Sequence, residues 1–364
     1  MKIAIILGTR PEIIKFSPII KGFIESNISF IVIHTNQHYS INMDELFFKE
    51  LQLPTVNYNL NVGSASNAIQ TARMLIGISE VFDIDRFTHI FIQGDTNSTL
   101  AGAIFGSKEN LPVLHLEAGL RSFDRKMPEE VNRILADHIS DFLFVPTEKQ
   151  KANLLKEGIS RDKIIITGNT ITDAISENIS LALNRSDIIS ELELDNIGYG
   201  LLTLHRPSNV DNKETLAKII NNFIEIQHIF PYPIIFPIHP RTSKKLKEFD
   251  LYLPGNIKVI EPVGYLDMLR LIQNSKILFT DSGGLQEEGC ILGIPTITIR
   301  KNTERPETVD TGANKLVGHS PNLLKSSIEY FSNNNLIKWD IPYFKQPTEK
   351  IIQFIKNMIL NDSS

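Results

Sequence analysis

Three acidic residues in the first half of the sequence have positions that suit proton transfer. Asp95 and Glu117 follow the apolar runs THIFIQ and LPVLHL, and Glu129 lies in the segment PEEVNRILADH four residues before Arg133. A Glu and an Arg at this spacing lie on one face of a helix. Carboxylates that converge in a partly desolvated site repel one another, which raises the pKa of at least one and provides an acid and a base. The alternatives are a helix-capping Asp and an exposed ion pair.

The stretch FTDSGGLQEEGCILGIP suggests an anion site. Ser282, Gly283 and Gly284 stand between the apolar run KILF and the segment LQEEGCIL, which has helical spacing. The first turn of a helix has free backbone N–H groups and the positive end of the macrodipole, and glycines let an anion approach the backbone. A phosphate is therefore the expected ligand, and a plain turn is the alternative.

Several cationic residues follow apolar runs and could meet a pyrophosphate. Arg10 directly precedes a proline suited to the first position of a helix, and Lys15 follows in the next turn. His205 is followed by Arg206, and Arg305 lies in a charged segment after the run PTITIR. Arginine donates to phosphate with two parallel hydrogen bonds. The alternatives are solvated helix ends, a structural histidine and a solvated loop.

The sequence lacks the motifs that bind redox nucleotides or transfer phosphoryl groups. No G-x-G-x-x-G follows the first apolar run, and no Walker A sequence occurs. Cys290 is the sole cysteine of the sequence, so neither an intramolecular disulfide nor a cysteine-based metal site can form. We expect chemistry that requires neither a cofactor nor a metal ion.

Composition and charge narrow the class of protein. The sequence is 42% hydrophobic, has a net charge of −5 without a basic stripe, and contains no apolar stretch long enough to cross a bilayer. Its N-terminus has too short an apolar run for a signal peptide. These features predict a cytoplasmic protein that binds neither nucleic acid nor membrane.

The elements that must position these residues alternate along the chain. Apolar β-branched runs separated by helical segments predict βαβ units and parallel sheets, and the alternation restarts near Tyr199. The runs are KIAIIL, SFIVIHT, THIFIQ, LPVLHL, DFLFVP and DKIIIT, then YGLLTLH, PIIFPIH, IKVIEP, KILFT, PTITIR and NKLVG. At 364 residues the chain exceeds the size of one core, so we expect an α/β protein with two doubly wound domains and ligands at the carboxyl ends of the strands.

With these motifs assembled, the chain resembles the non-hydrolysing UDP-N-acetylglucosamine 2-epimerases over almost its whole length. The motifs that match in order and spacing are GTRPEIIK, QGDTNSTLAG, HLEAGLRSFDRKMPEEVNR, TLHRPSNVDN, TDSGGLQEE and RKNTERPETV. The resemblance implies a GT-B fold with two Rossmann-like domains, residues 1–170 and 171–345, facing a central cleft. It also implies that a C-terminal helix at about 346–364 packs back on the first domain, and that the protein is a homodimer.

The resemblance assigns roles to individual residues. It implies that Asp95, Glu117 and Glu129 are acid–base carboxylates, which Arg133 positions, and that His205 is a catalytic residue that holds the UDP phosphates. It implies a UDP site that includes Arg10, Lys15, His239, Ser282, Gly283, Gly284, Glu288 and Arg305. Among these, Glu288 would take the ribose hydroxyls, and His239 corresponds to an active-site histidine of the family.

The activity implied is interconversion of UDP-GlcNAc and UDP-ManNAc, by elimination of UDP to 2-acetamidoglucal and re-addition. Two alternatives keep the family but change the outcome or the substrate: a hydrolysing epimerase that releases ManNAc and UDP, and a 2-epimerase of a UDP-2,3-diacetamido uronic acid. More distant alternatives are a GT-B glycosyltransferase and a non-catalytic UDP-sugar binder.

Overall fold

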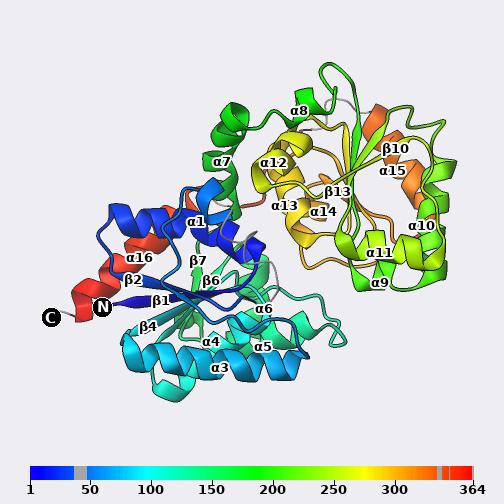
Figure 1. Cartoon of the computed structure of the whole chain (residues 1–364). Helices are drawn as coiled ribbons and strands as arrows, with labels where there is room; N and C mark the ends of the chain where they lie inside the picture. Colours follow the sequence, from blue (N-terminus) through cyan, green and yellow to red (C-terminus); the bar gives the residue numbers. More distant parts are fainter. Residues whose placement is uncertain (37–46, 334–337, 344, 363–364) are drawn as a thin grey trace. The chain divides into compact units, whose positions relative to one another are not determined.

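The computed structural model describes residues 1–36, 47–333, 338–343 and 345–362, and they form two compact units. The first unit comprises residues 1–177 and 343–364, and the second comprises residues 178–342. Each unit is built around one parallel sheet, and every apolar run that predicted a strand is a strand (Figure 1). The α/β class with two doubly wound sheets is confirmed.

The first unit contains a seven-stranded sheet in the order β3-β2-β1-β4-β5-β6-β7. Its strands are β1 (Ile3–Leu7), β2 (Phe30–His34), β3 (Tyr58–Asn59), β4 (His89–Gln93), β5 (Val113–Leu116), β6 (Phe142–Val145) and β7 (Ile164–Ile166). The sequence did not predict β3, because two residues are too few to show a periodic pattern.

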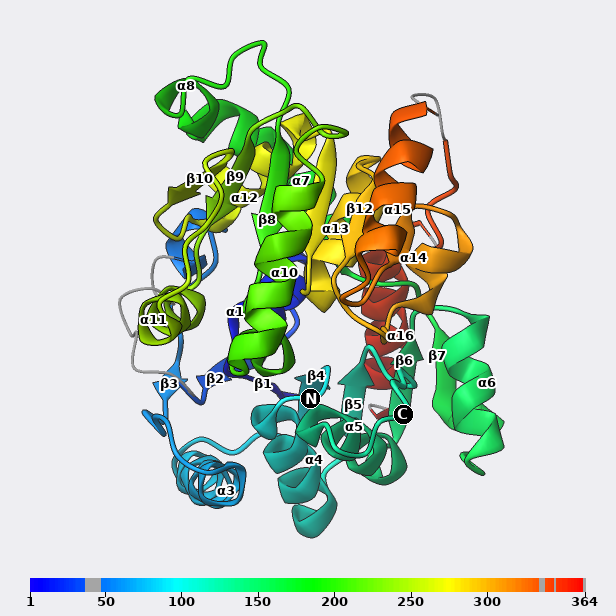
Figure 2. The same cartoon turned by 90° about the vertical axis from the view of Figure 1, so that its right-hand side faces the viewer.

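Helices cover both faces of this sheet. They are α1 (Arg10–Glu25), α3 (Asn67–Ile84), α4 (Asn97–Glu109), α5 (Pro128–Ile139), α6 (Glu148–Lys156) and α16 (Pro347–Asp362), with a 3-10 turn at Arg161–Lys163. Helix α7 (Ile171–Arg185) contains the boundary between the two units, after Glu177. Helices α3, α4 and α5 lie along one face, and α1 and α16 lie along the other (Figure 1 and Figure 2). A Cβ placed on Gly22 of α1 would lie 3.1 Å from Ile352 of α16, so these two helices pack closely.

The second unit contains a six-stranded sheet in the order β10-β9-β8-β11-β12-β13. Its strands are β8 (Gly200–Thr203), β9 (Ile234–Pro237), β10 (Ile257–Ile260), β11 (Ile277–Thr280), β12 (Thr296–Thr298) and β13 (Asn314–Leu316). Its helices are α8 (Ile188–Glu191), α9 (Pro207–Val210), α10 (Lys213–Glu225), α11 (Pro240–Phe249), α12 (Tyr265–Asn274), α13 (Gly283–Leu292), α14 (Pro306–Asp310) and α15 (Pro321–Asn333). Figure 1 shows α10 and α15 on one face of the sheet and α12 and α13 on the other.

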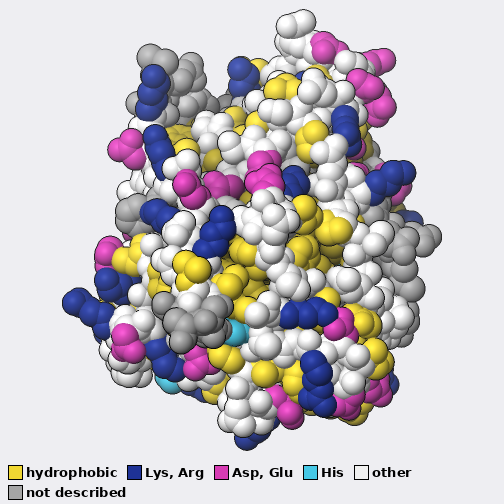
Figure 3. All heavy atoms as spheres, turned by 90° about the vertical axis from the view of Figure 1, so that its left-hand side faces the viewer, with side chains coloured by type: hydrophobic (Ala, Val, Ile, Leu, Met, Phe, Trp, Pro, Cys, Tyr) yellow, Lys and Arg dark blue, Asp and Glu magenta, His cyan; other side chains and the backbone are white. Residues whose placement is uncertain are grey.

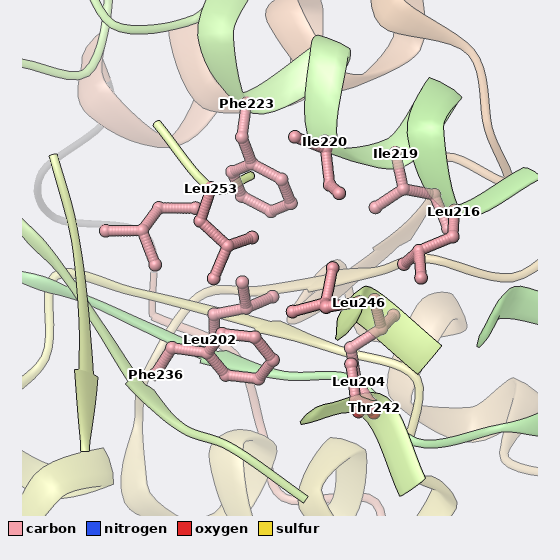
Figure 4. Close-up of a pocket in the computed structure, with 11 residues that line it drawn as sticks. Leu202, Leu204, Leu216, Ile219, Ile220, Phe223, Phe236, Thr242, Leu246 and Leu253 are labelled. Atoms are coloured by element: carbon pink, nitrogen blue, oxygen red, sulfur yellow. Dashed lines mark hydrogen bonds between the residues drawn. The ribbon is translucent and has the colours of Figure 1, made fainter. Parts of the chain in front are cut away.

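The apolar core of the second unit is tightly packed. Leu202, Phe223 and Leu246 surround a cavity of about 10 Å³ between β8, α10 and α11 (Figure 4). A space of this size holds at most one water molecule, and its lining is apolar. The cavity is therefore a packing gap of the core rather than a ligand site.

Two surface properties bear on the expected partners. In the view of Figure 3, Lys and Arg side chains are interspersed with Asp and Glu side chains, so this face carries no continuous basic stripe. Within the described part of the chain, every helix is too short or too polar to cross a membrane.

Candidate active site

The carboxyl ends of β4 and β5 bring two of the predicted carboxylates to one edge of the first sheet. The strands are adjacent and parallel, with Gln93 opposite Leu116, so Asp95 and Glu117 follow neighbouring strand ends. The Asp95 carboxylate contacts the guanidinium of Arg133, whose side chain is 3% exposed. Asp95 therefore has its own cationic partner.

Glu117 is buried and held by donors. Its carboxylate lies 2.5 Å from Nζ of Lys15 and accepts a hydrogen bond from Nδ2 of Asn169 at 3.2 Å. Nε2 of Gln93 donates to its second oxygen. Its backbone is left-handed, with φ of +67°, which is uncommon for a residue with a Cβ and often marks functional sites. This environment favours the ionised carboxylate of Glu117.

The two adjacent glutamates at the start of α5 have different surroundings. Glu129 is exposed, whereas Glu130 is buried. Glu130 accepts hydrogen bonds of 2.9 Å from the backbone N–H groups of Ser122 and Phe123, and it lies 2.9 Å from Nη1 of Arg133. Glu130 thus ties the loop after β5 to α5 and shares Arg133 with the loop after β4.

A fully buried network supports the loop that carries Glu117. Nδ1 of His115 lies 2.9 Å from Asp137, and its Nε2 lies 2.9 Å from the carbonyl oxygen of Gly94. Asp137 also accepts from the backbone N–H of Gly119 and from Arg121. Burial alone would raise the pKa of Asp137, but the contacts with His115 and Arg121 outweigh burial and hold that pKa below its ordinary value.

The two cations of the first motif have different surroundings. The Arg10 guanidinium lies 4.9 Å from the centre of the Phe47 ring, a cation–π distance. Lys15 is 3% exposed and its ammonium contacts Glu117. In this structure the charge of Lys15 therefore acts on a carboxylate rather than on solvent.

Glu12 joins the loop after β1 to the loop after β4, which carries Asp95. One oxygen accepts from the backbone N–H of Gly8 and the hydroxyl of Thr9, both at 2.9 Å, and the other accepts from the hydroxyls of Thr96 and Thr99 at 2.8 and 3.3 Å. Burial raises the pKa of Glu12 to about 7, although these hydrogen bonds lower it. A raised carboxyl pKa was expected for the predicted acid–base residues, and Glu12 was not among them.

In the second unit, His205 follows β8 and lies against a buried carboxylate. Nδ1 of His205 is 3.0 Å from Asp281, which is fully buried, whereas the His205 side chain is 40% exposed. The ring of His205 also lies beside the ring of His239, with 5.6 Å between the centroids. Nδ1 of His239 accepts a hydrogen bond from the backbone N–H of Arg241 at the start of α11.

The Ser-Gly-Gly turn has the predicted form. Helix α13 begins at Gly283, with Ser282 at its N-cap in extended conformation, directly after β11. A Cβ on Gly283 would lie 2.5 Å from Oε1 of Glu304, so this position accepts no side chain without a shift. Glu304 is held by Arg206 and Arg300, and these contacts outweigh burial and lower its pKa.

Glu288 and Arg305 both follow this turn in the sequence and are both buried. Arg305 is the N-cap residue of α14, and its Nε lies 2.9 Å from Glu287 of α13. Tyr265 is buried beside Glu288. Its burial, and then the negative charge of Glu288, raise the pKa of the Tyr265 phenol well above its ordinary value.

Within the described ranges, His, Cys, Asp and Glu side chains form no group of three or more that could hold a metal ion. The arrangement instead offers carboxylates on the first unit, and a histidine, arginines and a helix N-terminus on the second. These are groups for proton transfer and for binding phosphates.

Comparison with known proteins decides the family. A family model described as UDP-N-acetylglucosamine 2-epimerase matches residues 24–356. The chain is 53% identical over 350 residues to a UDP-N-acetylglucosamine 2-epimerase of Methanocaldococcus jannaschii, with 94% of this chain and 95% of the relative covered. The chain belongs to the UDP-N-acetylglucosamine 2-epimerase family.

Two further relatives of this 2-epimerase chain are informative. The crystal structure of the Methanocaldococcus jannaschii UDP-GlcNAc 2-epimerase in complex with UDP-GlcNAc and UDP has a TM-score of 0.91 and 50% identity, covering 98% of this chain and 100% of that one. The predicted GT-B fold is thereby confirmed. The UDP-2,3-diacetamido-2,3-dideoxy-D-glucuronate 2-epimerase of Pseudomonas aeruginosa is 42% identical over 330 residues, covering 90% of this chain and 91% of the relative.

The sequence patterns did not identify three buried carboxylates of this 2-epimerase as site residues. Glu12, Glu130 and Asp281 each lie within a motif that drew attention to a neighbouring residue. A signal existed for two of them, because Glu12 and Glu130 lie in the first turn of a helix, where a carboxylate can turn back to free N–H groups. Asp281 had no such signal apart from its place at a strand end.

Proposed function

We propose that the chain is a non-hydrolysing epimerase that interconverts UDP-GlcNAc and UDP-ManNAc. The C2 hydrogen of the sugar has no neighbouring carbonyl, so simple deprotonation and return is unfavourable. In an elimination, a carboxylate takes the C2 proton, the C–H electrons form the C1–C2 double bond, and the C1–O electrons leave with UDP. Re-addition of UDP with protonation of the opposite face completes the epimerisation, and no redox cofactor takes part.

The observation that carries this proposal is the environment of Glu117. A base that removes a proton must be ionised before reaction and held in place. Lys15 and the amides of Gln93 and Asn169 meet both requirements. We assign proton removal to Glu117, and we assign the second and third acid–base carboxylates to Asp95, oriented by Arg133, and to Glu129.

UDP requires donors that are in place before the C1–O bond breaks. We assign the diphosphate to Arg10, His205 and Arg305 with the start of α13, namely Ser282, Gly283 and Gly284. Glu288 is assigned to the ribose hydroxyls and His239 to the active site beside His205. Lys15 was predicted to lie near the diphosphate, and its contact with Glu117 leads us to assign it to that carboxylate.

Proton NMR of the purified protein with UDP-GlcNAc in D2O tests the proposal. The expected product is intact UDP-ManNAc with deuterium at C2, and Glu117→Gln should lose about 100-fold or more of this exchange. Release of ManNAc and UDP would instead identify a hydrolysing epimerase. Glu177→Gln, an exposed carboxylate on α7, is the control and should keep full activity.

A second substrate deserves the same test because of the Pseudomonas aeruginosa relative, whose name specifies a UDP-2,3-diacetamido uronic acid. The protein could fail to react with UDP-GlcNAc and still introduce deuterium at C2 of the diacetamido uronic acid nucleotide. That result would identify the diacetamido uronic acid nucleotide as the substrate. The acid–base residues proposed above would keep their roles, because both substrates undergo the same reaction at C2.

We also propose that the enzyme is a homodimer, as the family resemblance implies. Light scattering of the purified protein measures the assembly directly. A mass near 41.1 kDa would identify a monomer, and twice that value is expected.

A further inference from the structure

Asp281 is a buried carboxylate that the proposed function leaves without a role. It follows β11, is 0% exposed, and faces the loop after β8. Its Oδ2 accepts from the backbone N–H groups of His205 at 3.0 Å and Arg206 at 2.9 Å, and from Nδ2 of Asn209 at 3.1 Å. Its Oδ1 lies 3.0 Å from Nδ1 of His205 and also accepts from the backbone N–H of His205 at 3.1 Å.

These contacts fix the ionisation of Asp281. Burial raises the pKa of a carboxyl group, but the hydrogen bonds and the nearby imidazole outweigh burial and lower the pKa of Asp281. Because Oδ2 faces three donors, it must act as an acceptor. The same three donors fix the orientation of the Asp281 carboxylate.

Asn209 holds Asp281 from the opposite side. Its amide nitrogen donates to Asp281 and to the carbonyl oxygen of Ile299 at 2.9 Å, and its amide oxygen lies 2.9 Å from Nε2 of His319. Both hydrogens and the oxygen of Asn209 are thus engaged, which defines the orientation of its amide. The network therefore holds Oδ2 in place and presents Oδ1 to His205.

The position of Asp281 has a direct consequence for the imidazole. A hydrogen bond from Nδ1 to a carboxylate places the hydrogen on Nδ1 and fixes the plane of the ring. Nε2, on the other edge of the ring, is then turned away from Asp281. The His205 side chain is 40% exposed, so a ligand can reach the ring.

We propose that Asp281 is the positioning residue of His205, holding Nδ1 so that Nε2 faces the diphosphate that leaves C1. This inference rests on the proposed function, in which His205 binds that diphosphate. When the C1–O electrons pass to UDP, the ring in its doubly protonated form donates Nε2–H to the new phosphate oxygen, and Asp281 supplies the opposite charge. Asp281 touches neither the sugar nor the phosphate and acts through His205.

The variant Asp281→Asn distinguishes the positioning of His205 from structural support of the loop after β8. The three donors at Oδ2 require an oxygen there, so the amide nitrogen of the new side chain must face Nδ1 of His205. The backbone hydrogen bonds to Oδ2 survive, the contact of the His205 N–H with Oδ1 is lost, and the imidazole must change tautomer. Asp250→Asn is the matched control, because Asp250 is exposed and has the left-handed conformation that asparagine tolerates.

The decisive measurement is a double-mutant cycle of Asp281→Asn and His205→Ala on turnover. We expect Asp281→Asn to lower kcat by roughly 10- to 100-fold with a smaller change in KM, as for other carboxylates that orient a histidine. In the His205→Ala background it should change kcat less than about twofold, because coupled residues are non-additive. The same fold-change in both backgrounds would overturn the proposal and leave Asp281 a structural residue.

Nitrogen-15 NMR of the histidine rings provides a second readout that needs no activity. The His205→Ala spectrum identifies the His205 signals among those of the nine histidines. When the ring is neutral, its hydrogen should be on Nδ1 in the wild type and on Nε2 in Asp281→Asn. An unchanged tautomer would contradict the inference. A wild type that turns over no UDP-sugar would contradict the proposed function alone, because the tautomer still reports on Asp281.

Discussion

The ion pair of Lys15 and Glu117 lies buried in the candidate site. Each side chain is only 4% exposed. Breaking a buried pair by removing one partner leaves an uncompensated charge, which costs about 3–5 kcal/mol. The identity of residue 15 therefore matters for stability as well as for the reaction.

Replacing Lys15 with Met should lower the free energy of unfolding by about 3 kcal/mol and turnover by roughly 100-fold. Urea unfolding and the NMR assay measure the two effects. Lys21→Met is the control, because Lys21 pairs with the partly exposed Glu177, and it should change stability by less than about 1 kcal/mol. Adding Glu117→Gln to Lys15→Met should restore stability but not turnover. If the double variant is as unstable as Lys15→Met, the unpaired charge of Glu117 is not the cause of the lost stability.

Glu12 gives the protein a pH dependence of stability with a defined sign. The pKa of Glu12 is raised from 4.5 to about 7 on folding, so the folded state binds its proton more tightly. This contribution to stability is full below pH 4.5 and is lost as the pH rises to about 7. It amounts to at most roughly 3 kcal/mol.

The measurement is urea unfolding of the wild type and Glu12→Gln at pH 5 and pH 8. The glutamine can keep the bonds to Gly8 and Thr9 through its oxygen and donate to Thr96 through its nitrogen. Relative to Glu12→Gln, the wild type should lose stability between pH 5 and pH 8. Parallel pH profiles for the two proteins would show that Glu12 does not titrate in this range.

At the scale of elements, the start of α13 depends on one glycine more than on its neighbour. Gly283→Ala should destabilise the protein by about 1–3 kcal/mol, because the new Cβ would collide with Oε1 of Glu304. Gly284→Ala is the matched control: its Cβ would meet nothing nearer than Oγ of Ser282 at 4.0 Å, and alanine favours helix. Chemical unfolding compares the stabilities of Gly283→Ala and Gly284→Ala. Equal stabilities would show that the Glu304 side chain moves aside at little cost in free energy.

The elements themselves were predictable, whereas the direction of side chains was not. The strand-to-helix junction at Gly283 follows from local pattern, since an apolar run, two glycines and helical spacing each act over a few residues. The choice between Glu129 and Glu130 depends on which side of α5 faces the loop at Ser122, and that contact joins residues eight apart in sequence. Asp281 is a stronger case, because its partners at 205–209 are more than 70 residues away.

At the scale of the molecule, the two units carry different parts of the proposed chemistry. Hydrogen exchange with saturating UDP tests this division. We expect protection of the backbone at the start of α13 and in the loop after β8 in the second unit, because UDP contacts are proposed there. Uridine, which lacks phosphates, should protect the start of α13 much less. Protection confined to the first unit would contradict the assignment of UDP to His205, Ser282 and Arg305.

The first unit is completed by residues from the end of the sequence, and this has a consequence for folding during translation. Residues 178–342 are contiguous and can fold as they leave the ribosome, but the first unit also contains residues 343–364. Ile351 and Ile355 of α16 are fully buried, so the face of α1 that receives this helix stays uncovered until α16 has been synthesised. Domains usually fold in the order of their synthesis. Here the second unit can be finished first, and a nascent chain stalled before α16 leaves an apolar face that chaperones bind.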